Sequence, residues 1–194
     1  ALKADGVECH GYNGSLLARP GSVRTGAGGP YRVFTPFFRA LMDTAAAPAP
    51  LPAPSAMETV ADLESESVGD WALRPAAPDW AAGFDWTPGE AGAEAALSAF
   101  IGGGLKAYSK GRDYPAEASV SRLSPHLHWG EIHPWRALTA ARRAGAEGAV
   151  ASAEADKFAA ELGWRDFSAQ LLHHFPQMTD TAFRPEFDGM PWRD

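Results

Sequence analysis

Several side chains in the second half of the chain share one face of a predicted helix and could bind a flat ligand. Glu161, Trp164, Arg165 and Ser168 follow one another at spacings of i, i+3, i+4 and i+7, and Phe158 lies one turn earlier. An indole can stack on an aromatic ring, while a carboxylate and a guanidinium can hydrogen-bond its edges. An exposed helix with a Glu–Arg pair produces the same pattern. Taken by itself, the spacing favours that simpler interpretation.

A second group, Ser121-Arg122-Leu123-Ser124-Pro125, stands where another helix is predicted to begin. Ser124 is expected to be its N-cap and Pro125 its first helical residue. Free amide groups, two hydroxyls and a guanidinium at such a place could bind an anion. Capping alone requires Ser124 and Pro125, so it does not account for Ser121 and Arg122. On these residues alone, both an anion site and an ordinary capped helix remain open.

The other candidates carry less chemistry. Tyr108 lies four residues before Arg112, which puts both on one helical face, a pattern typical of a half-buried aromatic residue. A metal site requires converging ligands at suitable spacing, and the histidines show no such spacing, so we expect no metal and structural or surface roles for them. No pattern indicates a Ser-His-Asp nucleophile. The histidines considered are His126, His128, His133, His173 and His174.

Caps, apolar periodicity and helix-breaking residues predict the elements that must position these side chains. Residues 7–12 are expected to form a short strand, and residues 45–56, nearly all Ala and Pro, an extended linker. The second half is expected to be all-α. Three helices are predicted to begin at Thr35–Pro36, at Thr87–Pro88 with Glu90 in the first turn, and at Ser124. Three further helices are predicted to span Leu105 to about Lys110, Pro134 to Arg143, and about Ala153 to His174.

Composition limits the class of protein. The chain has 194 residues, 45% of them hydrophobic, and a net charge of −7. The single cysteine, Cys9, excludes an internal disulfide and suits a reducing compartment, and no apolar run approaches the ~18 residues of a membrane span, so we expect a cytoplasmic protein. Residues 104–165 carry nine basic and seven acidic side chains and are locally positive, which gives weak support for a nucleic-acid partner.

Six spaced segments together resemble the DNA photolyase/cryptochrome family, and in particular bacterial class I photolyases. The resemblance implies a mainly α fold: the N-terminal half of the all-helical FAD-binding domain, preceded by the tail of an α/β (Rossmann-like) domain and a long linker. The expected divisions are residues 1–25 for the tail, 26–86 for the linker and 87–194 for the partial helical domain. The segments are residues 29–36, Pro88-Gly89-Glu90, Tyr108 with Arg112-Asp113, residues 121–125, Glu161 with Trp164-Arg165, and His174-Phe175-Pro176.

The resemblance also assigns roles to individual residues. Glu161 and Trp164 would be catalytic, with Glu161 hydrogen-bonding the damaged pyrimidines and Trp164 stacking beside them. Val120 stands where the family often has Thr, so one hydroxyl contact to the cofactor would be missing. FAD would be bound by Tyr108, Val120, Ser121, Arg122, Leu123, Ser124, Phe158 and Arg165. DNA would be bound by Arg112, Glu161, Leu162, Gly163, Trp164, Arg165, Asp166, Phe167 and Ser168.

By resemblance, the activity is light-driven repair of cyclobutane pyrimidine dimers in damaged DNA by electron transfer from reduced FAD. A folate-type or deazaflavin-type antenna chromophore would belong to the full-length parent, and the protein would be a monomer. The alternatives are a cryptochrome-type blue-light receptor and an inactive helical fragment. The family's later segments, which hold further flavin contacts, are not in the sequence. We therefore expect the fragment alone to bind flavin weakly or not at all.

Overall fold

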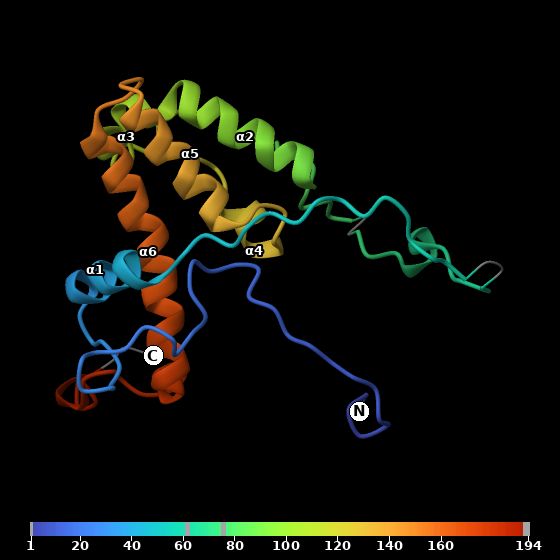
Figure 1. Cartoon of the computed structure of the whole chain (residues 1–194), viewed down its shortest axis with the longest axis horizontal. Helices are drawn as coiled ribbons and strands as arrows, with labels where there is room; N and C mark the ends of the chain where they lie inside the picture. Colours follow the sequence, from blue (N-terminus) through green and yellow to red (C-terminus); the bar gives the residue numbers. More distant parts are fainter. Residues whose placement is uncertain (1, 61–62, 75–76, 192–194) are drawn as a thin grey trace. The chain divides into compact units, whose positions relative to one another are not determined.

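The computed structural model describes residues 2–60, 63–74 and 77–191. It forms two compact units: residues 1–47 with 88–194, and residues 48–87. The described residues contain helices and no strand, in agreement with the mainly α expectation (Figure 1). The helical elements are α1 (Phe34–Thr44), η1 (Val68–Trp71), α2 (Glu90–Gly102), η2 (Gly104–Ala107), α3 (Tyr108–Gly111), α4 (Ser124–Trp129), α5 (Pro134–Ala146), α6 (Ser152–His174), η3 (Pro176–Thr179) and η4 (Pro185–Phe187).

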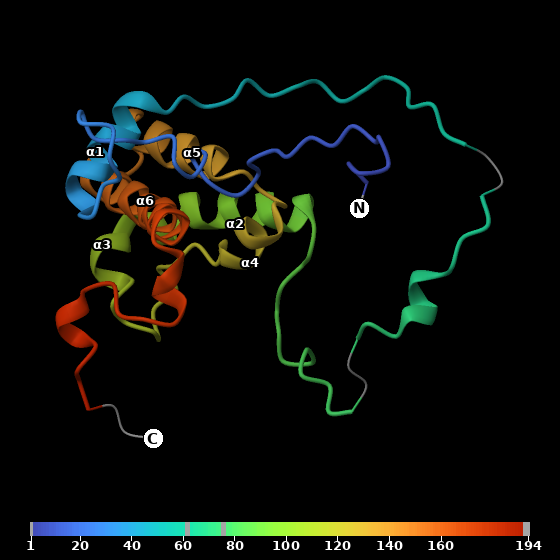
Figure 2. The same cartoon turned by 90° about the horizontal axis from the view of Figure 1, so that it is seen from below.

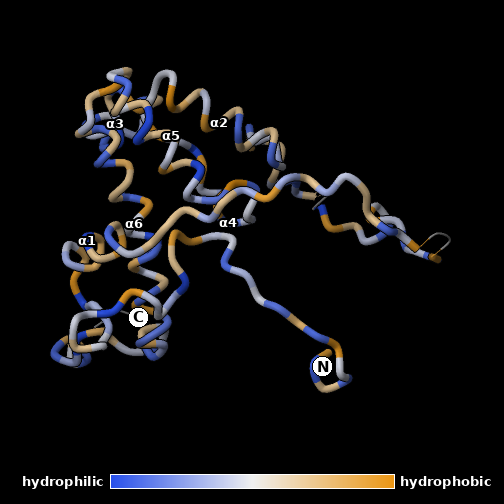
Figure 3. The backbone as a smooth tube through the Cα atoms, in the orientation of Figure 1, coloured by the Kyte–Doolittle hydropathy of each residue, from blue (hydrophilic) through white to orange (hydrophobic). Residues whose placement is uncertain are grey.

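The long helix α6 organises the first unit. Figures 1 and 2 show α5 beside its first half and α1 against its second half. Both helices bury small side chains, Ala137 and Ala141 on α5 and Ala155 and Ala159 on α6, and a β-carbon at Gly145 of α5 would lie 3.4 Å from that of Ala155. Because alanine side chains are short, the two helix backbones can approach closely. Hydrophilic and hydrophobic residues are interspersed along both helices (Figure 3).

Two polar contacts hold the other helices against this pair. Glu154 at the start of α6 accepts hydrogen bonds from the backbone N–H (2.6 Å) and the hydroxyl (2.7 Å) of Ser109 on α3. Arg136 on α5 donates two hydrogen bonds to Glu94 on α2, at 2.9 and 3.0 Å. Gly111 ends α3 directly against Ser119, where a β-carbon would collide with the serine side chain. The close approach of Ser119 to Gly111 places this part of the following loop beside α3.

An irregular N-terminal segment, residues 15–23, is bound along α6 by buried polar side chains. Asp166 accepts hydrogen bonds from the backbone N–H groups of Leu17 (3.1 Å) and Ala18 (2.9 Å). Gln170, one turn later, accepts from the N–H of Gly21 and donates to the carbonyl of Val23. Buried backbone groups outside helices and strands require such partners, and Asp166 and Gln170 supply them. This N-terminal segment is therefore part of the same unit as α6.

Several predicted elements differ from the structure. The strand expected over residues 7–12 is wrong, because those residues have no regular structure. The helix expected from Thr87 begins instead at Glu90, since Gly89 adopts φ +95° at the N-cap and Thr87 and Pro88 lie before it. Ser124 is the first residue of α4 and Leu123 occupies the N-cap position, so the predicted serine cap is also wrong. The predicted helix over residues 105–110 is split between η2 and α3.

Other predicted elements are confirmed. Residues 45–56 contain no helix or strand, as their Ala/Pro composition predicts. The helices expected near residues 134–143 and 153–174 correspond to α5 and α6. In the second unit, the described residues carry the short helix η1. The division of residues 1–25, 26–86 and 87–194 stays a prediction. Across the described residues, no helix is long and apolar enough to cross a membrane.

Candidate functional site

The site begins with an ion pair between two segments far apart in sequence. The guanidinium of Arg112, just after α3, pairs with the carboxylate of Glu161 on α6, and Lys157 Nζ lies 3.1 Å from the same carboxylate oxygen. Burial raises the pKa of the Glu161 carboxyl, but the hydrogen bonds and charges of Arg112 and Lys157 outweigh burial and hold the pKa below its ordinary value. Glu161 is therefore an anion at neutral pH.

Tyr108 connects this ion pair to a group of buried aromatic rings. The Arg112 guanidinium carbon lies 5.6 Å from the centroid of the Tyr108 ring, within range of a cation–π contact. Tyr108 meets Phe158 edge to face at 5.5 Å between centroids, and both rings contact Phe100 on α2. Burial raises the pKa of the Tyr108 hydroxyl, which is neutral at physiological pH. Tyr108 and Phe158 are buried within the chain's own core.

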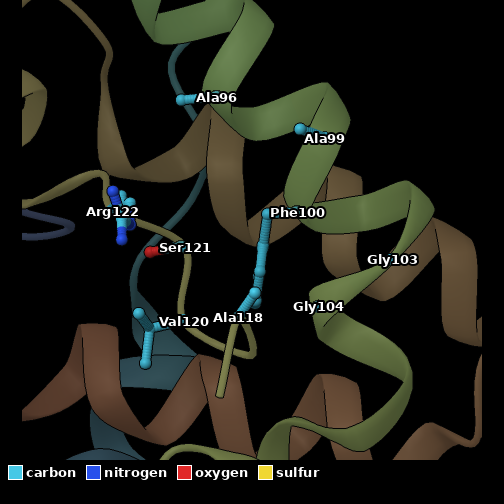
Figure 4. Close-up of a pocket in the computed structure, with 9 residues that line it drawn as sticks. All are labelled: Ala96, Ala99, Phe100, Gly103, Gly104, Ala118, Val120, Ser121 and Arg122. Atoms are coloured by element: carbon cyan, nitrogen blue, oxygen red, sulfur yellow. The ribbon is translucent and has the colours of Figure 1, made fainter. Parts of the chain in front are cut away.

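A cavity of about 390 Å³ opens between the end of α2 and the loop before α4 (Figure 4). Ser121 and Arg122 supply its polar groups, while Phe100 forms part of its apolar wall. Phe100 therefore touches both the cavity and the Tyr108–Phe158 pair. The remaining lining residues are small or apolar: Ala96, Ala99, Gly103, Gly104, Ala118 and Val120.

Arg122 has an unusual backbone conformation in this loop. Its φ of +53° is left-handed, a region that residues other than glycine rarely occupy. The turn exposes the Arg122 side chain, whereas Leu123 beside it is fully buried. The Ser121 hydroxyl accepts a weak hydrogen bond of 3.4 Å from the Leu123 N–H. The loop thus anchors itself through Leu123 and presents Ser121 and Arg122 to the cavity.

The outward face of α6 is divided between two environments. Trp164 is 43% exposed, and its ring stacks on Phe34 of α1 with 3.8 Å between centroids and 7° between planes. Arg165 is half-buried and donates to the backbone carbonyls of Ser15 (3.0 Å) and Leu127 (3.5 Å). Burial lowers the pKa of the Arg165 guanidinium, although the nearby charge of Asp166 opposes the change. Ser168 is exposed.

Four of the residues expected to bind DNA point into the fold. Leu162 and Phe167 belong to the apolar core, and Gly163 lies against the Phe38 ring. Asp166 is buried on the N-terminal segment, where burial raises the pKa of its carboxyl to about 6. Along α6, these four alternate with the exposed or half-exposed Glu161, Trp164, Arg165 and Ser168, as a 3.6-residue period requires.

The structure therefore brings the predicted site residues into two groups. One joins Arg112, Glu161, Tyr108 and Phe158, with the Ser121–Arg122 cavity next to it through Phe100. The other places Trp164 and Arg165 against α1, Ser15 and Leu127. Sequence reasoning missed Lys157, Phe100 and Phe34 as neighbours of the site. The i,i+4 spacing of Lys157 and Glu161 could have indicated the first, but the other contacts depend on tertiary packing.

Two of the histidines, His126 and His133, have local structural partners. His126 is buried, and its Nδ1 lies 2.5 Å from the Glu131 carboxylate. His133 caps α5 by accepting a hydrogen bond from the Trp135 N–H. Among the residues that the structure describes, no three His, Cys, Asp or Glu side chains gather in a way that could hold a metal ion.

Comparison with known proteins defines the class. The DNA photolyase family matches over residues 1–55. The deoxyribodipyrimidine photo-lyase of Agrobacterium fabrum is 41% identical over 199 residues, covering 100% of this chain and 40% of that protein. The enzyme of the same name from a Synechococcus strain is 34% identical, covering 100% of this chain and 42% of its own length. Cryptochrome-1 of Arabidopsis thaliana is more distant, at 28% identity over 98% of this chain and 29% of its length.

A solved structure matches as well. The crystal structure of a bacterial class III photolyase from Agrobacterium tumefaciens superposes with a TM-score of 0.81 at 41% identity, covering 100% of this chain and 40% of that one. The chain belongs to the DNA photolyase/cryptochrome family. It spans about 40% of the length of the two photo-lyases above. The finer expectation of class I stays a prediction, since the solved structure is described as class III.

Proposed function

We propose that this chain is part of a deoxyribodipyrimidine photo-lyase that repairs cyclobutane pyrimidine dimers in light, using reduced FAD. The observation that carries the proposal is the Arg112–Glu161 ion pair beside Tyr108. It brings together Arg112, which is expected to bind DNA, Glu161, which is expected to bind the pyrimidines, and Tyr108, which is expected to bind flavin. Three residues to which the family resemblance assigns different ligands therefore lie in one cluster of side chains.

The residues present fit the phosphates of FAD better than its isoalloxazine ring. The Ser121 hydroxyl and the exposed Arg122 guanidinium, at the mouth of a cavity of about 390 Å³, suit the phosphates of a dinucleotide. Tyr108 and Phe158 are covered by Phe100 and by one another, so they leave no open face for the isoalloxazine ring. This supports the expectation that the 194-residue chain alone binds flavin weakly. The cofactor would supply the light-driven electron transfer.

The chain's own residues would recognise and orient the lesion. The ionised Glu161 can accept hydrogen bonds from pyrimidine N–H groups, and Trp164, which is 43% exposed although it stacks on Phe34, can stack beside a base. Arg112 can pair with a DNA phosphate, to which a guanidinium binds in bidentate fashion. Leu162, Gly163, Asp166 and Phe167 would support this surface from beneath, since they are buried. Arg165 would fix the position of Ser15 and Leu127 beside it.

A cryptochrome-type receptor is the second candidate, favoured by the similarity to Arabidopsis cryptochrome-1. It shares the expectation of FAD but not that of lesion repair. Preference for damaged DNA separates the two candidates, because a signalling receptor requires no pocket for a pyrimidine dimer. The proposed repair enzyme would be a cytoplasmic monomer, and its full-length form would carry the second chromophore.

The decisive experiment measures binding of the 194-residue chain to a single-stranded oligonucleotide that carries one cyclobutane thymine dimer. The same oligonucleotide without the dimer is the reference. We expect tighter binding of the damaged strand, and Trp164→Ala to reduce this preference, since base–aromatic stacking contributes about 1–3 kcal/mol. Equal affinity for both strands would contradict lesion recognition by this chain.

Flavin binding is tested separately by following the quenching of FAD fluorescence as protein is added. We expect weak binding that the double variant Ser121→Ala/Arg122→Ala weakens further, because it removes both polar groups of the cavity. Arg74→Ala, at an exposed arginine of the second unit, is the matched control and should leave the titration unchanged. Identical titrations for all three proteins would argue against the cavity as the phosphate site.

A further inference from the structure

Two cations share a single carboxylate oxygen in the site. Arg112 Nη1 and Lys157 Nζ both pair with Oε1 of Glu161, and the Lys157 distance is 3.1 Å. The side chain of Glu161 is only 23% exposed, whereas that of Lys157 is 44% exposed. One partly buried anion is thus held from two directions. The other titratable groups at the cluster are Tyr108, beneath the Arg112 guanidinium, and Asp113, 3.8 Å from Arg112 Nε.

The two cations differ in how they are attached to the fold. Arg112 lies in the irregular segment after α3, so its distance from Glu161 depends on how that segment packs against α6. Lys157 lies one turn before Glu161 on α6 itself, at a spacing of i,i+4. A movement of Arg112 therefore leaves Lys157 and Glu161 at their i,i+4 spacing on the same helix.

Because Glu161 is partly buried, a second cation would favour its ionised form if Arg112 leaves. A carboxylate removed from water favours its protonated form, and nearby positive charge opposes that tendency. Arg112 has a competing partner in the proposed complex, because a guanidinium binds a phosphate at least as well as a carboxylate. Without Lys157, the transfer of Arg112 to a phosphate would leave Glu161 partly buried and alone.

We propose that Lys157 is a positioning residue, which keeps Glu161 ionised and oriented when Arg112 exchanges the carboxylate for a DNA phosphate. The exchange rests on the proposed function, whereas the hold of Lys157 on Glu161 does not. Charge is conserved in the exchange: Arg112 passes from one anion to another, and Lys157 remains with the first. No proton moves.

The hold of Lys157 is tested by titrating the Glu161 carboxyl with ¹³C NMR in the 194-residue chain. The Glu161→Gln spectrum identifies the signal by its loss. We expect Arg112→Gln to shift the titration to a higher pH, and Arg112→Gln/Lys157→Gln to shift it further. The variant Arg112→Gln/Lys157→Arg keeps a positive charge at residue 157. Its shift should therefore equal the smaller shift of Arg112→Gln alone. Lys106→Gln, at an exposed lysine of η2, should have no effect.

If the Glu161 carboxyl titrated at the same pH in Arg112→Gln and in Arg112→Gln/Lys157→Gln, the proposal would be overturned. Circular dichroism at 222 nm shows whether each variant is folded. Should the double variant unfold, Lys157→Gln alone decides the question, since it keeps the Arg112–Glu161 pair. This single variant is expected to shift the Glu161 titration upward by a smaller amount, and a titration identical to that of the wild type would equally refute the role of Lys157.

The exchange is tested with the dimer-containing oligonucleotide. We expect Lys157→Gln to weaken binding of the damaged strand about two- to five-fold at low salt, as expected for a partly exposed ion pair, and Lys157→Arg to restore it. The loss should be larger for the damaged than for the undamaged strand. An equal loss on both strands would show that Lys157 contacts phosphate directly and would refute the exchange. If the wild type does not distinguish the strands, lesion recognition fails while the carboxyl titration still decides the hold of Lys157.

Discussion

The ring of Phe38 on α1 occupies the space that a β-carbon at Gly163 on α6 would need. An ideal β-carbon at this position would overlap Cδ2 and Cε2 of the Phe38 ring. Phe38 in turn stacks beside Phe34, which lies face to face with Trp164. The absence of a side chain at Gly163 thus sets how closely α1 approaches α6, and with it the position of the Trp164 ring.

Gly163→Ala should therefore destabilise the protein although alanine is the better helix former. Overpacking a tight contact between helices lowers the unfolding free energy by about 1–3 kcal/mol, more than the propensity gain. Gly102→Ala at the end of α2 is the control, because no atom lies within 4 Å of its β-carbon position. Urea denaturation should show a loss for Gly163→Ala and no loss for Gly102→Ala. A stabilised Gly163→Ala variant would mean that Phe38 can move aside freely.

Asp166 should make the protein more stable in mild acid. Burial raises the pKa of its carboxyl to about 6, although the N–H groups of Leu17 and Ala18 favour the ionised form. The folded state therefore binds a proton more readily than the unfolded chain, and this contribution is present below pH ~4 and lost as pH rises through about 6. The unfolding free energy of the wild type minus that of Asp166→Asn should increase by about 2 kcal/mol from pH 7 to pH 4. A difference that shrinks in acid would contradict this sign.

Glu154 should show the opposite pH dependence. Its hydrogen bonds from the backbone and hydroxyl of Ser109 hold the pKa of the carboxyl below its ordinary value. The stabilisation is present above pH ~4.5 and is lost as pH falls through the lowered pKa. Glu154→Gln should reduce the unfolding free energy by about 1–2 kcal/mol at pH 7 and by less at pH 3, measured by denaturation at both values. The control Glu147→Gln removes an exposed i,i+4 pair with Arg143 and should change it by less than about 0.5 kcal/mol.

Two substitutions of Arg122 distinguish the effect of its strained backbone on stability from the effect of its side chain on FAD binding. Its φ of +53° is unfavourable for alanine and favourable for glycine. Both Arg122→Ala and Arg122→Gly remove the guanidinium from the cavity, but Arg122→Gly also removes the strain. The glycine variant should be more stable than the alanine variant by about 0.5–1 kcal/mol, while both lose FAD affinity equally. Thermal denaturation and FAD titration of the two variants provide the measurement, and an alanine variant of equal or greater stability would count against strain at this residue.

Trp164 should stabilise the contact between α1 and α6 as well as offering a stacking surface. Its ring lies 3.8 Å from that of Phe34, and 43% of the residue remains exposed. Trp164→Ala should lower the unfolding free energy by about 1–2 kcal/mol, less than for a fully buried aromatic residue. Trp164→Phe keeps a stacked ring and should lose less than about 1 kcal/mol. Equal losses in the two variants, measured in urea, would show that stacking on Phe34 does not contribute.

Helix-starting residues and apolar periodicity in the sequence predicted the ranges of α5 and α6 well. Pro134 at the start of α5 and the 23-residue run of α6 agree with the expected ranges. Thr87 and Ser124 failed as caps because the chain had other constraints there: Gly89 turns with a positive φ before α2, and Leu123 is drawn into the core before α4. Capping residues indicate where a helix can begin, but packing of the preceding residue selects among neighbouring positions.

The sequence by itself determined the family and the face of α6 that carries Glu161, Trp164, Arg165 and Ser168, because residue order and a 3.6-residue period are local properties. Tertiary structure decided which partners those side chains meet. Arg112 reaches Glu161 across 49 positions of sequence, and Asp166 binds a segment near residue 17 rather than facing outward. Such pairings depend on how helices pack and on which backbone groups lack partners of their own, and neither is encoded in the spacing of residues within one helix.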